Sequence, residues 1–455
     1  MHDRTHFGTA RPRDRTTVSV LGLCGRPSPA ARGRPAALGG RRLSTTYGGP
    51  VMHPMVKPAL RRGWRDLNTV QFGMTPAHAL TLAPVDTATG GFLELLNGTR
   101  GPALLREEGH RMDLPEGHVD RVVERLAGAG LLDDSRGGGP AAEALREKKD
   151  VLDRLRPDLA TLSLTTSAPG DAIRHLAARR ALRVGVRGAG RVGAALAGLL
   201  SGAGVGEVDV RDGGCVEPWD VAPGGLPARS VGDRRDAAAR RVVRAAAPGG
   251  PPRRSPAAPP DGNGPGLSLV VVAPRDDVAV HTPDPASVES LMASGTPHLY
   301  AGVVEGTGVV GPLVLPGETG CAGCLYADRT DRDPAWPRLV AQWRSGRPRP
   351  VPPCDLTLAA TVAGFAAAHA LAFLDGGTPA GTGVRWEVSL PALRWHARPV
   401  AAHPACPCGA AAEGKQEHIA EDGARGATMA GQGPPSAARH GVGPTRPAGT
   451  WRAHV

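Results

Sequence analysis

The stretch that decides the fold is Leu182-Arg-Val-Gly-Val-Arg-Gly-Ala-Gly-Arg-Val-Gly193, in which a short apolar run enters a glycine-rich turn. Ala194–Ser201 continues with residues that favour a helix, and Glu207–Arg211 predicts a second strand. A strand, a glycine turn and a helix in this order are typical of an open α/β domain, because glycines let the backbone approach a phosphate and the helix N-terminus supplies free N–H donors. We therefore expect an α/β fold around this turn.

The same turn supplies candidate ligands for a nucleotide. Gly188, Gly190 and Gly193 form a Gly-x-Gly-x-x-Gly pattern, and Asp212 follows the second predicted strand, nineteen residues after Gly193. An acidic side chain at that point can accept both hydroxyls of a ribose. The alternative is a βαβ unit that keeps its glycines for packing of the helix on the strand and binds nothing. The arrangement favours the nucleotide-type geometry and leaves actual binding open.

Four of the seven cysteines form two tight pairs, which suit a metal better than disulfides in a chain of 455 residues. The pairs are Cys321-x-x-Cys324 and Cys406-x-Cys408. Zinc prefers four tetrahedral sulfurs in closed structural sites, which leave no open position for catalysis. Flanking glycines permit the tight turns that such knuckles need. We expect structural zinc; a redox dithiol and unbound core cysteines are the alternatives, and the solitary Cys215 and Cys354 are expected to be idle.

Composition divides the chain into five segments. Residues 1–51 are rich in Arg, Gly and Pro and are expected to be disordered; Met52 and Met55 are candidate translation starts, which would make this segment an upstream artefact. A winged-helix-like domain is predicted for 52–135, and a linker with a connecting helix at Ala141–Asp158 for 136–180. The α/β domain is predicted for 181–410, with a surface loop at Ala246–Gly266, and a disordered tail for 411–455.

The first domain is predicted from its hydrophobic pattern. Thr69–Met74 and His78–Leu82 alternate like the two strands of a hairpin. Three helical patterns follow near Gly90–Leu96, Pro102–Glu108 and Pro115–Ala129. Two strands and three short helices describe a small winged-helix-like α+β domain.

Charge and hydropathy exclude two classes of partner. The formal charge is +11, but residues 1–50 carry nine Arg against two Asp, so the body of the chain is nearly neutral. A nucleic-acid partner then loses its main electrostatic support. Leu356–Leu374 approaches the length of a membrane span, yet Ala is its most frequent residue and it lies between cysteine pairs that must meet. A buried helix is the better interpretation, and we expect no membrane partner and a cytoplasmic protein.

The glycine turn, the acid after the second strand and the late cysteine pairs together resemble the ThiF/E1-like superfamily. The strongest similarity is to actinobacterial ThiF-like proteins described as bacteriocin-biosynthesis cyclodehydratase or leader-peptide-binding proteins. It rests on Gly320-Cys-Ala-Gly-Cys-Leu325, Asp331-Arg-Asp-Pro-Ala-Trp-Pro337 and His403-Pro-Ala-Cys-Pro-Cys-Gly409, and on Lys57-Pro-Ala-Leu60 near the start. The resemblance covers about residues 55–410. It implies a Rossmann-like ThiF/E1 domain after a winged-helix-like peptide clasp.

Departures from the adenylating members of this superfamily bear on activity. Those members follow the second strand with Asp-x-Asp and a Ser-Asn-Leu-x-Arg-Gln run, whereas here Gly213-Gly214 and Asp220–Leu226 stand in these places. Asp276 or Asp277 would have to supply the acid for Mg²⁺ that offsets charge on ATP. Arg229 is a weak catalytic candidate. Arg234 and Arg235 could also hold phosphates, but solvated surface is the expectation for all three arginines.

The resemblance implies a role in ribosomal peptide modification of the bacteriocin, azole or azoline type. The clasp would bind a precursor leader peptide by strand addition at Thr69–Met74, and a separate cyclodehydratase would act on the substrate. An adenylyltransferase using ATP and Mg²⁺ on a peptide or carrier-protein C-terminus is the alternative. A DNA-binding regulator is a weaker third hypothesis, kept open by Arg61, Arg62 and Arg65. Members of the superfamily are commonly homodimers, so we expect one here by analogy.

Overall fold

A computed structural model describes residues 52–249, 266–346 and 351–411. The predictions for residues 1–51 and for nearly all of the tail lie outside the described residues, as does most of the predicted loop Ala246–Gly266.

A small α+β unit comes first in the described chain. Its elements are β1 (Pro54–Val56), β2 (Arg62–Asp66), β3 (Thr69–Phe72), β4 (Leu80–Leu82), α1 (Thr87–Leu95), α2 (Pro102–Arg111), α3 (His118–Gly128) and β5 (Leu132–Asp134). The predicted hairpin is present as β3 and β4, with Val70 opposite Leu82. The three predicted helices are present as well. The pairing of β1 with β5 was not anticipated, because each is only three residues long.

The position of β3 corrects one prediction. The sheet order is β2-β3-β4, so β3 is the central strand and pairs on both sides. Thr69–Met74 therefore offers no free edge for an added strand, contrary to the expectation. The expectation failed because Arg62–Asp66 is polar and exposed along most of its length and carries no alternating pattern that would predict a strand. The free edges of this sheet are β2 and β4.

The core of the α+β unit lies between its sheet and its helices. Phe72 of β3, Phe92 of α1 and Leu126 of α3 are fully buried in one cluster. A Cβ atom at Gly109 of α2 would lie 2.4 Å from Val119 Cγ2, so a residue without a side chain lets α2 approach α3. Gly130 has a positive φ of 69° and follows the end of α3, where a glycine commonly terminates a helix.

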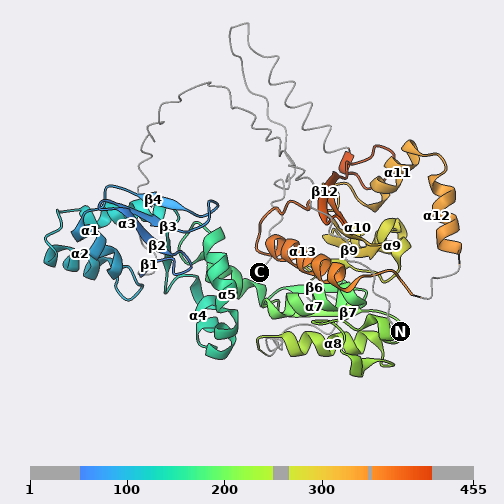
Figure 1. The fold of residues 1–455 in the computed structure, drawn as a ribbon, viewed down its shortest axis with the longest axis horizontal. Helices are drawn as coiled ribbons and strands as arrows, with labels where there is room; N and C mark the ends of the chain where they lie inside the picture. Colours follow the sequence, from blue (N-terminus) through green and yellow to red (C-terminus); the bar gives the residue numbers. More distant parts are fainter. Residues whose placement is uncertain (1–51, 250–265, 347–350, 412–455) are drawn as a thin grey trace, which may run out of the picture. The chain divides into compact units, whose positions relative to one another are not determined.

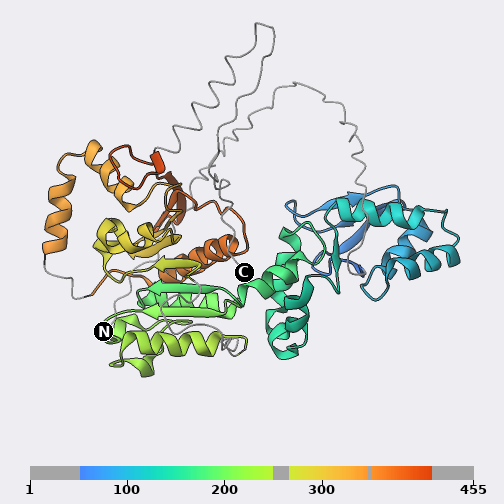
Figure 2. The same cartoon turned by 180° about the vertical axis from the view of Figure 1, so that it is seen from behind.

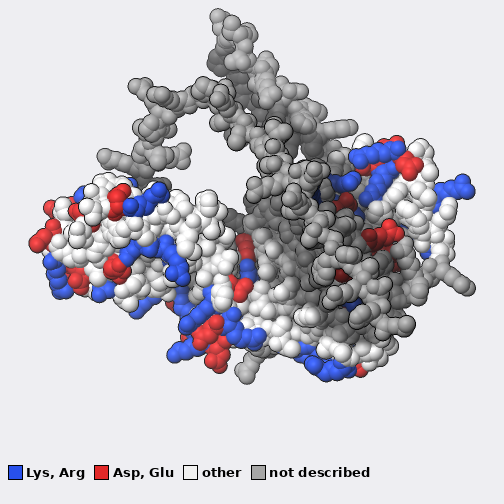
Figure 3. Space-filling view, in the orientation of Figure 1, with Lys and Arg blue, Asp and Glu red and all other residues white. Residues whose placement is uncertain are grey.

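Basic and acidic side chains are interspersed on the face of this unit seen in Figure 3. Two of the three arginines that kept DNA binding open have polar partners. Arg62 pairs with Glu94, and Arg65 donates a hydrogen bond to Gln71 at 3.0 Å. This pattern gives the nucleic-acid hypothesis no support beyond the arginines themselves.

Three helices follow where one connecting helix was expected. They are α4 (Gly139–Arg146), α5 (Lys149–Thr165) and α6 (Asp171–Arg179). The predicted helix Ala141–Asp158 is wrong at its middle, because the chain leaves helical geometry at Lys148. The break lets Leu145 of α4 and Leu155 of α5 reach the same buried cluster as Leu176 of α6. A single straight helix could not turn these side chains toward one another.

The large domain is built on a seven-stranded mixed sheet with the order β12-β11-β10-β9-β8-β6-β7. Strands β9, β8, β6 and β7 run parallel to one another. Beyond β9 the sheet continues through β10, β11 and β12, and each of these pairs antiparallel with the strand before it. The strands are β6 (Arg183–Arg187), β7 (Glu207–Arg211), β8 (Leu269–Val272), β9 (His298–Val304), β10 (Thr307–Val314), β11 (Val384–Ser389) and β12 (Arg394–Pro399). The helices are α7 (Arg191–Gly202), α8 (Arg235–Ala246), α9 (Asp277–His281), α10 (Glu289–Ala293), α11 (Ala322–Arg332), α12 (Trp336–Ser345) and α13 (Leu356–Leu374).

Helices α7 and α13 pack together against one face of this sheet (Figures 1 and 2). Val186 of β6, Leu196 of α7 and Val362 of α13 are fully buried in the shared cluster. Among the described residues, α13 is the one helix long and apolar enough to cross a membrane, and half of its apolar window is buried in this core. The packing supports the predicted buried helix.

Candidate functional site

The glycine turn joins β6 to α7 as the sequence predicted. Gly188 has a φ of 108°, and a Cβ there would lie 2.0 Å from the carbonyl oxygen of Ala273. A Cβ at Gly193 would lie 2.1 Å from the carbonyl oxygen of Gly188. Backbone packing therefore requires both glycines, whether or not a ligand binds. These contacts support the alternative interpretation for Gly188 and Gly193, in which the glycines serve packing.

Gly190 differs from these two glycines because a side chain covers it. A Cβ at Gly190 would lie 2.7 Å from Cγ of Arg275. Arg275 follows β8 at the carboxyl end of the parallel strands, which is where ligands bind in open α/β sheets. Gly190, the middle glycine of the pattern, therefore makes room for an arginine at the expected phosphate position.

Asp212, which follows β7, is hydrogen-bonded to the glycine turn. Its Oδ2 accepts a hydrogen bond from the Ala189 amide at 2.6 Å, and its Oδ1 accepts one from Arg235 Nη1 at 2.7 Å. The side chain is only 9% exposed. Since each oxygen already has a donor, the predicted contact with a ribose would have to use the remaining lone pairs.

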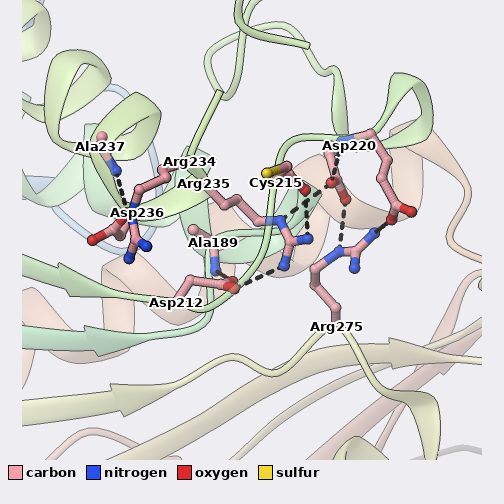
Figure 4. A network of polar contacts seen from close by, with 10 residues as sticks. Ala189, Asp212, Cys215, Asp220, Arg234, Arg235, Asp236, Ala237 and Arg275 are labelled. Carbon is pink, nitrogen blue, oxygen red and sulfur yellow. Dashed lines mark hydrogen bonds and ion pairs between the residues drawn. The ribbon is translucent and has the colours of Figure 1, made fainter. Parts of the chain in front are cut away.

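Arg235 and Arg275 join three carboxylates beside the turn (Figure 4). Arg235 forms ion pairs with Asp212 and Asp220 and donates a hydrogen bond to the carbonyl oxygen of Cys215. Arg275 donates from Nε to Asp220 Oδ1 at 2.8 Å and pairs with Glu217. Burial acts to lower the pKa of Arg275, but Glu217 and Asp220 outweigh it and raise that pKa. The network contains two cations and three anions, and it places fixed charge at the predicted ligand site.

The three arginines considered for phosphate contacts lie in different environments. Arg235 is buried, so the expectation of a solvated side chain was wrong for it. Arg234 is 71% exposed and pairs with Asp236, as a surface residue does. Arg229 is exposed in the short turn Ala228–Ser230 and does not line the cavity beside the glycine turn. Sequence reasoning missed Glu217 and Arg275, because neither belongs to a recognisable motif.

A cavity of about 1010 Å³ opens beside this network. Gly188, Asp212, Arg235, Arg275, Asp276 and Asp277 are among the residues that line one part of it. Asp276 caps α9, because its Oδ1 accepts hydrogen bonds from the amides of Val278 and Ala279. Asp277 occupies the first position of the same helix. Both acids thus stand at the carboxyl end of β8, where the sequence predicted an acid for Mg²⁺.

Aromatic rings line the far part of the cavity. His281 and Trp343 are lining residues whose ring centroids lie 6.0 Å apart, and both contact Trp336 edge to face. Arg329 lies over Trp336 at 4.8 Å, so the indole is held from its other side. Burial lowers the pKa of His281 to about 4, which keeps its ring neutral at pH 7. This wall is partly open to solvent at Trp343, which is 44% exposed.

The structure brings the four paired cysteines together. The sulfur of Cys321 lies 3.8 Å from that of Cys324 and 3.6 Å from that of Cys406, and the sulfurs of Cys324 and Cys408 are 3.5 Å apart. All four lie within 4.8 Å of one another. Tetrahedral zinc with Zn–S bonds of about 2.3 Å requires sulfurs about 3.8 Å apart, so the donor set and spacing fit this ion. Hydrogen bonding from Cys321 lowers the pKa of Cys324, which favours its thiolate form.

The glycines around the cysteines serve this approach. A Cβ at Gly323 would lie 2.9 Å from the sulfur of Cys406, and one at Gly320 would lie 2.3 Å from the carbonyl oxygen of Val400. His403 Nε2 lies 2.9 Å from Asp331 Oδ2, which ties the second knuckle to α11. The local sequence thus makes room for both knuckles to meet.

In the described parts of the chain, two solitary cysteines lie outside this cluster. Cys215 is exposed, and Cys354 is half-buried beside a second cavity of about 170 Å³ at the glycine turn. Burial raises the pKa of the Cys354 thiol, which disfavours a nucleophilic thiolate. The prediction that neither acts as a nucleophile is consistent with these environments.

Comparison with known proteins identifies the large domain. The sequence profile of the ThiF family matches residues 172–408, more than half of the chain. The chain belongs to the ThiF family. The resemblance drawn from the glycine turn and the cysteine pairs is confirmed, and so is the fold class. A search of curated protein sequences finds no match.

Solved structures share the fold of this ThiF protein. The crystal structure of Escherichia coli MccB with succinimide is 14% identical with a TM-score of 0.56, and the match covers 78% of this chain and 99% of MccB. E. coli MccB with ATP gives the same identity and TM-score over 79% of this chain and 100% of MccB. The heterocyclase TruD is 18% identical with a TM-score of 0.52, over 79% of this chain and 43% of TruD. At these identities the likeness shows the fold alone.

Proposed function

We propose that this ThiF protein acts in the modification of a ribosomally made peptide of the bacteriocin, azole or azoline type. The α+β unit binds the leader segment of a precursor, and the ThiF domain presents the rest of the peptide to a separate cyclodehydratase. The extent of the structural likeness carries the proposal. It covers 79% of the chain, whereas the family profile covers only residues 172–408, so it extends onto residues outside the ThiF domain. The microcin C7 biosynthetic enzyme MccB has been solved with N-formylated MccA, and TruD is a heterocyclase.

Strand β4 is the edge that suits a leader peptide. A peptide that adds to a sheet needs a strand whose outer N–H and C=O groups are free. Of the two edges, β2 is irregular, because its register with β3 shifts between Trp64 and Asp66. Such bulges twist an edge away from further pairing. β4 pairs with β3 in continuous register, and Leu80 on it is 42% exposed.

Hydrogen exchange tests the edge directly. The probe is a synthetic leader peptide of a small Cys/Ser/Thr-rich precursor encoded near this gene, added in excess to the full chain. We expect the amides of β4 (Leu80–Leu82) to gain protection while those of β2 (Arg62–Asp66) stay unchanged. The two edges of one sheet control for each other. Protection confined to β2, or none in either strand, would contradict leader binding at β4.

The second candidate function is ATP-dependent adenylation of a peptide or carrier-protein C-terminus. The cavity beside the glycine turn favours it, because Asp276 and Asp277, which could hold Mg²⁺, line this cavity together with Gly188 of the turn. MccB with ATP and with AMPCPP has been solved in the same fold. The network of Asp212, Arg235 and Asp220 stands where adenylating members carry a different motif, which is why this function ranks second.

ATP–pyrophosphate exchange separates the two functions. The full chain is assayed with ATP, Mg²⁺ and radiolabelled pyrophosphate, with and without the precursor peptide. A presenting protein gives no exchange above a boiled control, whereas an adenylating enzyme gives peptide-dependent exchange. Robust exchange would therefore replace the first proposal with the second.

Three further features complete the proposal. Structural zinc occupies the cluster of Cys321, Cys324, Cys406 and Cys408, supported by sulfur spacing that fits a tetrahedron. The protein is a homodimer by analogy with its superfamily. It works in the cytoplasm, where thiols stay reduced and available to metal. In this proposal residues 52–135 form the leader-binding domain, 136–180 the linker and 181–410 the ThiF domain.

A further inference from the structure

Arg275 lies across the glycine turn and is held there by two carboxylates (Figure 4). Its Cγ sits 2.7 Å from the position that a Cβ of Gly190 would take, so its aliphatic stem packs directly on that glycine. Its guanidinium points away from the turn, toward Glu217 and Asp220. The aliphatic part of the side chain therefore covers the turn, while its charged group contacts the two carboxylates.

The two carboxylates differ in exposure. Asp220 is 4% exposed, and its Oδ2 also accepts a hydrogen bond from the Glu217 amide at 3.0 Å and pairs with Arg235. Glu217 is 42% exposed; its side chain pairs with Arg275 and also accepts from the Asp220 amide in a capping box. Asp220 is thus a buried anchor, whereas the ion pair between Arg275 and Glu217 is partly exposed and therefore contributes little to stability.

The N-terminus of α7, which Arg275 covers, suits a phosphate. α7 is twelve residues long, and its N-cap Gly190 has no side chain to satisfy the free amides of the first turn. The smaller cavity of about 170 Å³ touches Gly190, Arg191, Gly193 and Arg275 together. A phosphate that enters here meets both the amides and the guanidinium. Arg275 Nε donates to Asp220 and Nη2 donates to Glu217. A phosphate that takes the terminal edge of the guanidinium, Nη1 with Nη2, therefore competes with Glu217 for Nη2.

We propose that Arg275 exchanges Glu217 for the phosphates of a nucleoside triphosphate bound at the glycine turn. In the nucleotide-free protein the Arg275–Glu217 bond holds the cover closed, and binding transfers the guanidinium to the ligand. Arg275 is therefore a phosphate-binding and gating residue that the sequence motif does not contain. This inference rests on the nucleotide site named under the second candidate function, and it concerns binding, so it holds whether or not adenylation follows.

A double-mutant cycle on the full chain tests the exchange. ATP affinity is measured by titration calorimetry for the wild type, Glu217→Gln, Arg275→Ala and the double variant. We expect Glu217→Gln to tighten ATP binding about fivefold, because it removes the competitor for the guanidinium. Arg275→Ala should weaken binding about 10- to 100-fold through loss of a charge-assisted hydrogen bond. The double variant should match Arg275→Ala, since the effect of Glu217 passes through Arg275.

Matched controls separate this effect from general loss of charge. Asp328→Asn and Arg332→Ala break an exposed ion pair of 2.8 Å on α11 and should leave ATP binding unchanged. Adenosine carries no phosphate, so its affinity should not respond to Glu217→Gln. Inorganic triphosphate distinguishes the two sources of phosphate: a response equal to that of ATP assigns the site to polyphosphate in general, and overturns a nucleoside triphosphate as the specific ligand.

Hydrogen exchange of the nucleotide-free protein provides a readout that needs no ligand. Arg275→Ala should speed exchange of the amides of Arg191 and Val192, because the cover is removed. Unchanged exchange would overturn the cover. If the wild type binds ATP but the variants bind it equally well, the exchange of partners is wrong and the nucleotide site stands. If no protein binds ATP or triphosphate at millimolar concentration, both are wrong.

Discussion

Arg235 shows how strongly a single residue can be placed by its partners. It is buried at the start of α8, where water cannot stabilise its charge. Asp212 and Asp220 supply the compensation, and Asp212 also binds the glycine turn through the Ala189 amide. The arginine therefore links the turn to the loop that carries Glu217. Removal of a charge from such a network leaves its partners buried and unpaired, which costs more than the pair contributed.

Replacing Arg235 by methionine tests this dependence. We expect Arg235→Met to lower the free energy of unfolding by about 3 kcal/mol, because Asp212 and Asp220 stay buried without this cation. The measurement is urea unfolding followed by circular dichroism. Arg234→Met, at a neighbouring position whose side chain is 71% exposed, should change stability by less than about 0.5 kcal/mol. Equal losses in both variants would show that the buried network is unimportant.

His298 on β9 predicts a pH dependence of stability. It is fully buried, and burial lowers its pKa to about 4, whereas an unfolded chain has a value of about 6.5. Between these values the unfolded chain binds a proton that the folded chain excludes, so stability falls as the pH drops from about 6.5 toward 4. Above about pH 6.5 both forms are neutral and the effect vanishes.

The His298→Leu variant isolates that contribution. Between pH 7.5 and pH 5.0 we expect the wild type to lose about 2 kcal/mol more unfolding free energy than the variant. Urea unfolding at the two pH values gives the comparison. His281, whose pKa burial also lowers to about 4, is present in both proteins and cancels from the difference. Parallel pH profiles would mean that His298 is not protected from protonation.

At the scale of elements, the two cysteine knuckles depend on how closely α11 approaches the chain after β12. Cys321 precedes α11 and Cys324 lies in its first turn, while Cys406 and Cys408 follow β12. Gly323, the second residue of α11, has no space for a side chain beside the sulfur of Cys406. The knuckle geometry is therefore a property of packing between elements as well as of the Cys-x-x-Cys spacing.

A pair of glycine substitutions tests this packing. Gly323→Ala should place a Cβ 2.9 Å from the Cys406 sulfur, displace that ligand and reduce bound zinc well below one ion per chain. Gly364→Ala in the middle of α13 meets no atom within 4 Å, so it should keep its zinc and gain up to about 1 kcal/mol from better helix propensity. Metal analysis by mass spectrometry and thermal unfolding measure both. Full zinc occupancy in Gly323→Ala would contradict the close approach.

At the scale of the whole molecule, the cysteine cluster closes a long loop of the ThiF domain. Cys321 and Cys406 are 85 residues apart, and the chain between them contains α11 to α13, the strand β11 and the edge strand β12. A metal at this point joins the end of β10 to the far end of the sheet. Binding energy at such a site adds to folding free energy, because the unfolded chain does not hold the four ligands together.

Zinc removal should therefore destabilise the domain. Protein that has never met a chelator should contain about one zinc per chain, and removal of the ion or Cys406→Ser should lower Tm by roughly 10 °C. Cys215→Ser is the matched control, since that thiol is exposed and outside the cluster. Less than about half an equivalent of zinc in the untreated wild type would refute the site.

Prediction from sequence succeeded where the signal was local. The strand β7 and the helix α13 have the bounds that the hydrophobic pattern predicted. The hairpin of β3 and β4 was also found, because its alternation lies within a few residues. The connecting helix was predicted unbroken, since nothing in Arg146-Glu-Lys-Lys-Asp150 forbids a helix and only the shared core of α4, α5 and α6 requires the break.

The sequence by itself determined the glycine turn with its helix, the grouping of four cysteines and the membership in the ThiF family. These depend on residue types at short spacings, which act through local backbone geometry and ligand preference. Only the tertiary structure decided that β3 is central, that Arg235 is buried and that Arg275 covers Gly190. Each of these results from contacts between segments distant in the chain, and strand order and charge pairing leave no mark in the local pattern.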